Sequence, residues 1–115
     1  MATDIPPSVV CEVPQAVDGD TVRCINLPKP VRLVGIDAPE LPGHCRQGRT
    51  CVPGDGALAR RSLARLMAGN RVTVTFTGRD RYGRYLGILW VEEINLNCEM
   101  LRAGQAVRRY SALDC

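Results

Sequence analysis

Histidine, lysine and aromatic side chains are scarce in this chain, and long apolar runs are absent. His44 is the only histidine and no two cysteines have the C-x-x-C spacing, so we expect no zinc site. The apolar runs fall far below the roughly 20 residues that cross a bilayer, so we expect no membrane partner. Residues 1–10 show no basic and apolar leader pattern, although a leader removed from a longer precursor is compatible with this.

Length and composition indicate one domain that folds alone, over residues 1–115. Apolar residues make up 45% of the chain and charged residues 23%, values typical of a soluble globular protein, which we expect to be a monomer. The formal net charge is +3, and Lys29 is the only lysine among the 15 basic residues. This charge fits a polyanionic partner, but an arginine-rich genome would give the same composition.

Cysteine is abundant by contrast. The chain has six: Cys11, Cys24, Cys45, Cys51, Cys98 and Cys115. An even number in so short a chain favours an oxidising compartment, so we expect a secreted or periplasmic protein. We predict a disulfide between Cys45 and Cys51, because they bracket a segment with little apolar content. Free buried thiols are the alternative, and the pairing of the other four cysteines stays open.

Strand-like runs occupy the first third of the chain, over residues 9–13, 21–25 and 31–36. The Asp18-Gly19 pair is a hairpin signal, and a proline-flanked loop at residues 28–30 marks a second turn. These signals predict three antiparallel strands in a meander.

The rest of the chain predicts a long surface loop, a helix, two strands and a second, short helix. Residues 41–55 lack apolar periodicity, whereas apolar side chains recur at helical spacing over residues 57–68. Residues 71–76 and 85–91 alternate as strands, and a short helix is expected after Asn97. This order favours a mainly β, α+β fold: a five-stranded Greek-key barrel of the oligonucleotide-binding type (OB-fold), with the main helix between strands 3 and 4 and a short C-terminal helix.

Two short segments, residues 17–22 and 32–40, place carboxylates and an arginine at the ends of strand-like runs. Carboxylate oxygens are natural ligands of calcium or magnesium, and the planar donors of arginine suit a phosphate. Metal, arginine and a spare carboxylate together indicate phosphodiester chemistry.

The spacing within the second segment sets a geometric condition. Arg32 and Asp37 are five residues apart, and a regular strand would direct their side chains to opposite faces. One shared site requires a bend, which Gly35 is best suited to provide. We therefore predict irregular backbone over residues 34–37.

Four sequence blocks resemble, in order and with compatible gaps, the signature blocks of the staphylococcal nuclease (thermonuclease) family. The resemblance covers about residues 13–110. The blocks are Asp18-Gly19-Asp20-Thr21-Val22, residues 32–40, Asp80-Arg81-Tyr82-Gly83-Arg84, and Gly104-Gln105-Ala106 followed by Tyr110.

The resemblance implies a calcium ion held by the carboxylates of Asp20 and Asp37 and by the backbone carbonyl of Ala38. The family often has threonine at this last position, but a backbone ligand does not depend on its side chain. Glu40 matches the general base that activates the attacking water. Each of these acids also has an ordinary interpretation, as a turn residue, a strand cap or an exposed acid.

The same resemblance assigns the phosphate and nucleotide contacts. Arg32 and Arg84 match the two arginines that bind the scissile phosphate, which makes Arg32, Glu40 and Arg84 the catalytic set. Arg81, Tyr82 and Tyr110 match positions that contact the terminal phosphate and the nucleotide. With only five aromatic residues in the chain, we expect little sequence discrimination.

The expected function is therefore that of a calcium-dependent, sugar-nonspecific nuclease, which hydrolyses DNA and RNA by in-line attack of water and leaves 3′-phosphate ends. The alternative is a catalytically inactive OB-fold module of the same family that binds nucleic acid or protein without cutting. A third interpretation is a structural module held by disulfides, with coincidental motifs.

Overall fold

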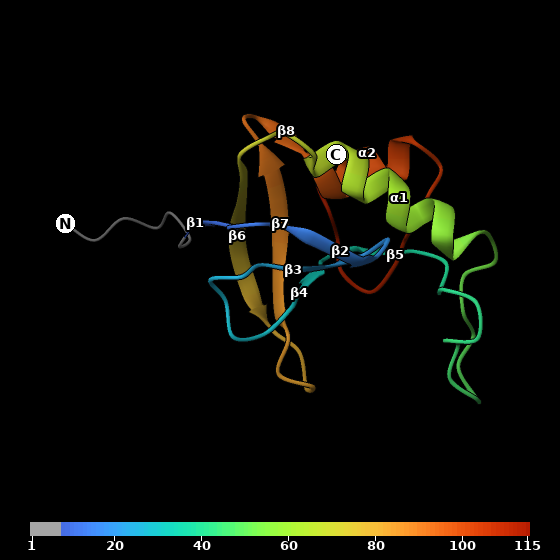
Figure 1. Cartoon of the computed structure of the whole chain (residues 1–115). Helices are drawn as coiled ribbons and strands as arrows, with labels where there is room; N and C mark the ends of the chain where they lie inside the picture. The colour runs from blue at the N-terminus through green and yellow to red at the C-terminus, as the bar shows by residue number, and fades with distance from the viewer. Residues whose placement is uncertain (1–7) are drawn as a thin grey trace.

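The computed structural model describes residues 8–115 and shows a mixed α+β chain, mostly β sheet, with two helices in this range (Figure 1). The predicted domain limits and the interpretation of residues 1–10 extend beyond the described residues. The elements are β1 (Ser8–Val10), β2 (Gln15–Asp18), β3 (Thr21–Arg23), β4 (Val31–Leu33), β5 (Ile36–Asp37), α1 (Gly56–Met67), β6 (Val72–Arg79), β7 (Tyr85–Val91), β8 (Ile94–Asn95), α2 (Leu96–Arg102) and β9 (Val107–Arg108).

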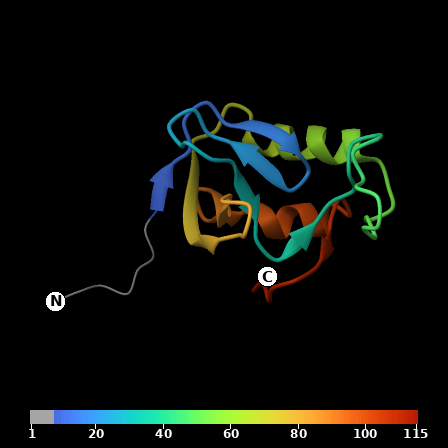
Figure 2. The same ribbon diagram turned by 90° about the horizontal axis from the view of Figure 1, so that it is seen from below.

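The main sheet has the strand order β1-β6-β7-β4-β3-β2, with β8 paired to β7. Strands β2, β3 and β4 form an antiparallel meander in which the predicted strands 21–25 and 31–36 take part, and β4 runs parallel to β7. A separate antiparallel pair joins β5 to β9, so the C-terminal segment lies beside the chain just after β4 (Figure 2). This arrangement is consistent with a fold of the oligonucleotide-binding type.

The first predicted strand, residues 9–13, is wrong in its extent and its partner. Strand β1 ends at Val10 and pairs with β6, whereas β2 supplies the first arm of the Asp18-Gly19 hairpin. The interruption has a local cause, because Val13 has φ +47° and the next residue, Pro14, has no N–H to donate. The described strands are therefore more numerous than the five predicted, and those before α1 are shorter than predicted.

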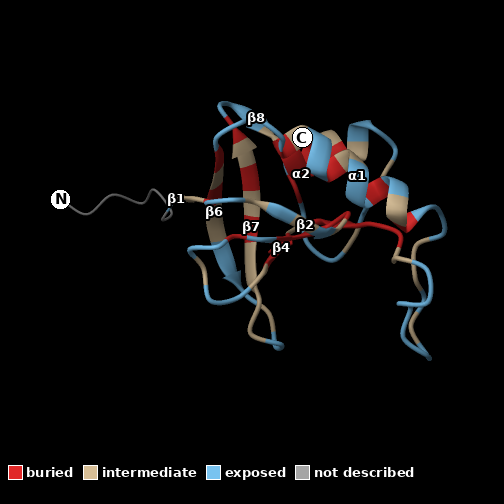
Figure 3. Cartoon of the chain, viewed as in Figure 1, coloured by how far each residue is buried: buried red, intermediate tan, exposed pale blue. Residues whose placement is uncertain are grey.

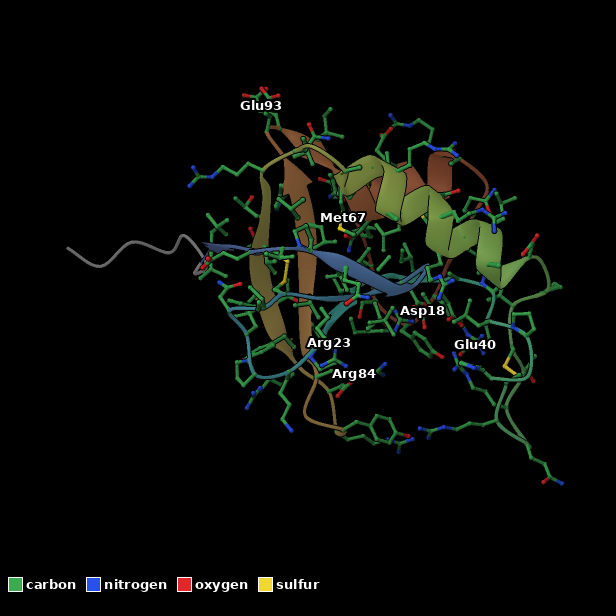
Figure 4. All side chains as sticks on the ribbon, in the orientation of Figure 1. Asp18, Arg23, Glu40, Met67, Arg84 and Glu93 are labelled. Carbon is green, nitrogen blue, oxygen red and sulfur yellow. A yellow bond between two sulfur atoms is a disulfide. The ribbon has the colours of Figure 1, made fainter. Side chains whose placement is uncertain are left out.

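Helix α1 buries one stripe of side chains at intervals of four residues. Ala59, Leu63 and Met67 are buried, and Asp55 caps the helix by accepting a hydrogen bond from the N–H of Leu58 at 3.0 Å. Figure 4 shows Met67 pointing from α1 into the interior. The helix packs against β2 and α2, α2 packs against β7, and buried residues lie on β4, β6 and β7 as well as on the two helices (Figure 3).

Helix α2 begins earlier than predicted. Asn95 is its N-cap, accepting from the N–H of Cys98 at 3.1 Å, and Asn97 lies in the first turn with no exposed surface. The Asn97 side chain accepts from the N–H of Leu89 at 3.1 Å and donates to the carbonyls of Val34 and Gly87 at 3.0 and 3.1 Å. It thus ties α2 to β7 and to the segment that follows β4.

All six cysteines are paired. The predicted Cys45–Cys51 disulfide is confirmed, and the other pairs are Cys11–Cys24 and Cys98–Cys115. Three disulfides are consistent with an oxidising extracellular or periplasmic location. Among residues 8–115, neither helix has the length and apolar character needed to cross a membrane.

Candidate active site

The predicted bend is confirmed at the end of β4. A turn at Val34 and Gly35 separates β4 from β5, and Gly35 has φ +82°. This left-handed conformation suits glycine, and an added Cβ would also lie 2.7 Å from the Cβ of Leu113. The bend brings Arg32 Nη2 within 3.4 Å of Asp37 Oδ1, so the two side chains lie together.

Asp20 reaches the same site from the hairpin between β2 and β3. One carboxylate oxygen accepts from the backbone N–H of Ala38 at 2.9 Å, and the other accepts from the hydroxyl of Thr21 at 3.1 Å. Arg32 Nη2 also lies 3.4 Å from Asp20 Oδ2. A Cβ on Gly19 would lie 2.7 Å from the Cβ atoms of Ala38 and Ala59, so the hairpin glycine permits this close approach.

Asp37 is 1% exposed and is surrounded by three arginines. Arg49 Nη2 lies 3.2 Å from each of its carboxylate oxygens, and Arg109 Nη1 lies 2.7 Å from Oδ2, in addition to the Arg32 contact. Burial and the neighbouring charge of Asp20 still raise the pKa of Asp37. Burial also raises the pKa of Asp20, with Arg32 opposing the effect.

Glu40 pairs with Arg49, whose Nη1 lies 2.6 Å from Oε1 of Glu40. Neither Arg49 nor Arg109 was predicted as a site residue. The sequence signal for Arg49 is a basic residue inside the disulfide-closed loop that follows Glu40, and Arg109 adjoins Tyr110. Arg109 also donates to the carbonyl of Thr50 at 3.0 Å, which links the C-terminal segment to that loop.

Arg84 lies in the turn between β6 and β7 and contacts none of the three acids. Its Nε donates to Asp80 Oδ2 at 2.7 Å, and the other oxygen of Asp80 accepts from the N–H groups of Tyr82 and Arg84. Burial alone would raise the pKa of Asp80, but the Arg84 and backbone hydrogen bonds hold it below its usual value. Arg81 Nη2 donates to the hydroxyl of Tyr82 at 3.1 Å.

A cleft of about 770 Å³ collects most of the predicted site residues. Figure 4 shows Asp18, Glu40 and Arg84 in the lower part of the molecule, away from Glu93 at the top. The predicted residues that line the cleft are Asp20, Arg32, Glu40, Arg81, Tyr82, Arg84 and Tyr110. Asp37 and Ala38 are buried at 1% and 2% exposure and do not line it.

The donors available to a metal ion are oxygens. Within residues 8–115, no three acidic, histidine or cysteine side chains form a metal-binding group. Asp20 and Asp37 nevertheless place two carboxylates close together in a buried setting, which raises the pKa of both. A bound cation would favour their ionised forms and so oppose this rise. These carboxylates and the adjacent Ala38 carbonyl are hard ligands, so their chemistry fits calcium if water completes the coordination.

Comparison with known proteins identifies several relatives. An "uncharacterized endonuclease" of Escherichia coli O157:H7 is 39% identical over 97 residues, which cover 82% of this chain and 57% of that protein. An "uncharacterized endonuclease" of Haemophilus influenzae is 32% identical over 99 residues, covering 84% and 50%. "Protein ParB" of Escherichia coli is 37% identical over 106 residues, covering 83% and 54%.

The chain spans about half the length of these curated relatives. The model of the family described as "Staphylococcal nuclease homologue" matches residues 30–114, which is more than half of the chain. The matched range includes the bend, the cleft arginines and the segment that ends near Tyr110. The chain therefore belongs to the family of staphylococcal nuclease homologues.

Proposed function

We propose that this chain is a calcium-dependent, sugar-nonspecific nuclease that hydrolyses DNA and RNA by in-line attack of water, leaving 3′-phosphate ends. One observation carries the proposal: the bend at Gly35 brings Arg32 and Asp37 together with Asp20, beside Glu40 and the cleft. Family membership and the endonuclease names of two relatives support it. We further infer a monomer in an extracellular or periplasmic compartment, with no membrane partner.

Glu40 is the proposed general base. Its Oε1 is held by Arg49, so Oε2 is the oxygen that can accept a hydrogen bond from the attacking water. The side chain is 20% exposed and faces the cleft, where water and a phosphate can meet. A base must lie within one hydrogen bond of the water it activates.

Arg32 and Arg84 are the proposed phosphate-binding residues. Arg32 is held in place by its Nη1 bond to the carbonyl of Leu33, and its Nη2 lies over the two aspartates. Arg84 uses Nε to pair with Asp80, which leaves its terminal nitrogens for a phosphate. Guanidinium groups on two sides of the cleft would stabilise the charge that builds on the phosphate oxygens.

Asp20, Asp37 and the carbonyl of Ala38 are the proposed calcium ligands. A bound calcium ion would supply positive charge to the phosphate oxygens as they become more negative. Ala38 is also fixed by the bond from its N–H to Asp20, which keeps this backbone segment against the hairpin.

Arg81, Tyr82 and Tyr110 are the proposed nucleotide contacts. Both tyrosines are largely exposed, at 55% and 72%, and line the cleft. An exposed ring gives a base a surface to stack on with little sequence discrimination.

We infer that the scaffold is the five-stranded Greek-key barrel. The two ends of the main sheet, β1 and β2, are consecutive in the chain and separated by residues 11–14 only. Taken as one bent strand, they complete a circuit with β3, β4, β7 and β6. The main helix α1 then falls between strands 3 and 4 of that circuit, and α2 is the short C-terminal helix.

The test is a cleavage assay on single-stranded DNA, duplex DNA and RNA, with calcium or with a calcium chelator. Wild-type protein should cut all three only with calcium, and Arg32→Gln and Glu40→Gln should lose orders of magnitude in rate. Arg65→Gln, an exposed change on α1, serves as the matched control. Nucleic acid binding without cleavage in any condition would favour the inactive module instead.

A further inference from the structure

The loop closed by the Cys45–Cys51 disulfide places an arginine between two of the site's acids. Arg49 presents a planar fork, with Nη1 at 2.6 Å from Glu40 Oε1 and Nη2 at 3.2 Å from both oxygens of Asp37. Among residues 8–115, Arg49 is the one side chain that hydrogen-bonds the Glu40 carboxylate. The direction of that carboxylate thus depends on where Arg49 is held.

The loop has little apolar content to hold its own shape. Its backbone makes short-range turns, from His44 N–H to the Leu41 carbonyl at 3.0 Å and from Arg49 N–H to the Arg46 carbonyl at 3.1 Å. The disulfide closes a ring with a sequence separation of six residues around Arg49. Holding an arginine in one position costs conformational entropy of both its side chain and the loop backbone. A disulfide ring restricts the backbone already, so less backbone entropy is lost when Arg49 forms its contacts.

We propose that Arg49 is a positioning residue for Glu40, and that the Cys45–Cys51 ring serves to hold Arg49 in this role. The inference rests on the proposed nuclease function. Arg49 occupies Oε1 of Glu40 and directs Oε2 toward the cleft, where it accepts a hydrogen bond from the attacking water. A misplacement of about 1 Å at such a group costs about a hundredfold in rate, so the effect falls on kcat rather than on substrate binding.

The experiment measures kcat and KM for cleavage of single-stranded DNA in calcium. Arg49→Gln should lower kcat by about tenfold to a hundredfold with KM close to that of the wild type. Arg49→Lys should recover part of the loss, because one ammonium can bond Glu40 but cannot bridge both acids. Arg65→Gln should leave both constants unchanged.

Two further experiments distinguish a positioning role of Arg49 from a general loss of structure in its variants. Added ethylguanidinium should restore part of the kcat of Arg49→Ala, which only a folded protein with an otherwise intact site can show. Replacing Cys45 and Cys51 with serine should also lower kcat. Combining those changes with Arg49→Gln should cost no more than Arg49→Gln alone, because the ring acts through Arg49.

The outcomes are distinct. An unchanged kcat in Arg49→Gln would overturn the inference, and so would a raised kcat, because Arg49 would then obstruct the acids. A raised KM with unchanged kcat would overturn it too, since Arg49 would then be a substrate contact. Absence of cleavage by the wild-type protein would refute the proposed function, and this role with it.

Discussion

Replacing Asn97 with alanine should test how the bend beside the candidate active site is held. The Asn97 side chain makes three hydrogen bonds in the interior, and no part of it is exposed. The carbonyl of Gly87 also accepts from the N–H of Val34 at 3.0 Å, so it keeps a partner in the variant. The N–H of Leu89 and the carbonyl of Val34 would lose the bonds that Asn97 makes to them.

The size of the effect follows from these two groups. Strand β4 runs beside β7 only as far as the pair of Leu33 and Gly87, so it offers no partner to the N–H of Leu89. A buried polar group left without a partner costs about 1–3 kcal/mol. Two fully buried groups would give about 2–6 kcal/mol, and because the Val34 carbonyl is only partly buried we expect Asn97→Ala to lower the free energy of unfolding by about 3 kcal/mol.

The assay is urea denaturation with the disulfides intact, comparing the free energy of unfolding and the slope m. Asn95→Ala is the control, because it removes an N-cap on the same helix, at a cost of about 1 kcal/mol. Equal, small losses in the two variants with the same m would refute the argument, since Asn97 would then be acting as an ordinary helix residue.

Three other perturbations have clear expected outcomes. Gly35→Ala should lower the free energy of unfolding by at least about 1 kcal/mol and slow cleavage, because φ is +82° at the bend; unchanged unfolding and cleavage would argue against it. The lowered pKa of Asp80 stabilises the fold above the unfolded value of about 3.9, and that contribution is lost as the pH falls through the folded pKa. Asp80→Asn, which cannot form the Arg84 ion pair, should therefore lose less stability than the wild type between pH 5 and pH 3, and equal losses in urea titrations would contradict this. Replacing Cys11 and Cys24 with alanine opens a loop of sequence separation 13 and should cost about 3 kcal/mol, whereas an unchanged thermal midpoint would show that the disulfide adds nothing.

The parts of the fold that could be predicted from the sequence are those with short-range causes. The Asp18-Gly19 hairpin and the helix α1 follow from a turn pair and an apolar repeat, and both are present. The pairing of β1 with β6 joins residues more than 60 positions apart, as in Val9 with Val74, and no local pattern encodes it. The predicted strand over residues 9–13 is cut short because Val13 adopts a positive φ that a β-branched residue rarely takes.

In the candidate site, too, features with local causes could be predicted and contacts between distant residues could not. The spacing of Arg32 and Asp37 was sufficient to predict a bend, because side-chain alternation is a property of the strand itself. The contacts of Arg49 and Arg109 with Asp37 span 12 and 72 residues and depend on the disulfide loop and on the pairing of β5 with β9. Such contacts arise only once the chain has folded, so the motif blocks alone did not reveal them.

The site also gives a structural reason for part of the chain's preference for arginine over lysine. Arg49 contacts Glu40 through Nη1 and Asp37 through Nη2, and Arg32 contacts Asp20 and Asp37 through Nη2 and the Leu33 carbonyl through Nη1. Spreading contacts over two nitrogens in this way requires a planar group with donors in fixed directions, whereas a lysine ammonium has a single nitrogen. Burial raises the pKa of Asp20 and Asp37, repulsion from Asp20 adds to the rise at Asp37, and the guanidinium group of Arg32, placed between them, opposes the rise at both. Base composition of the genome alone would not account for arginine at these positions, because here the geometry of the side chain is used as well as its charge.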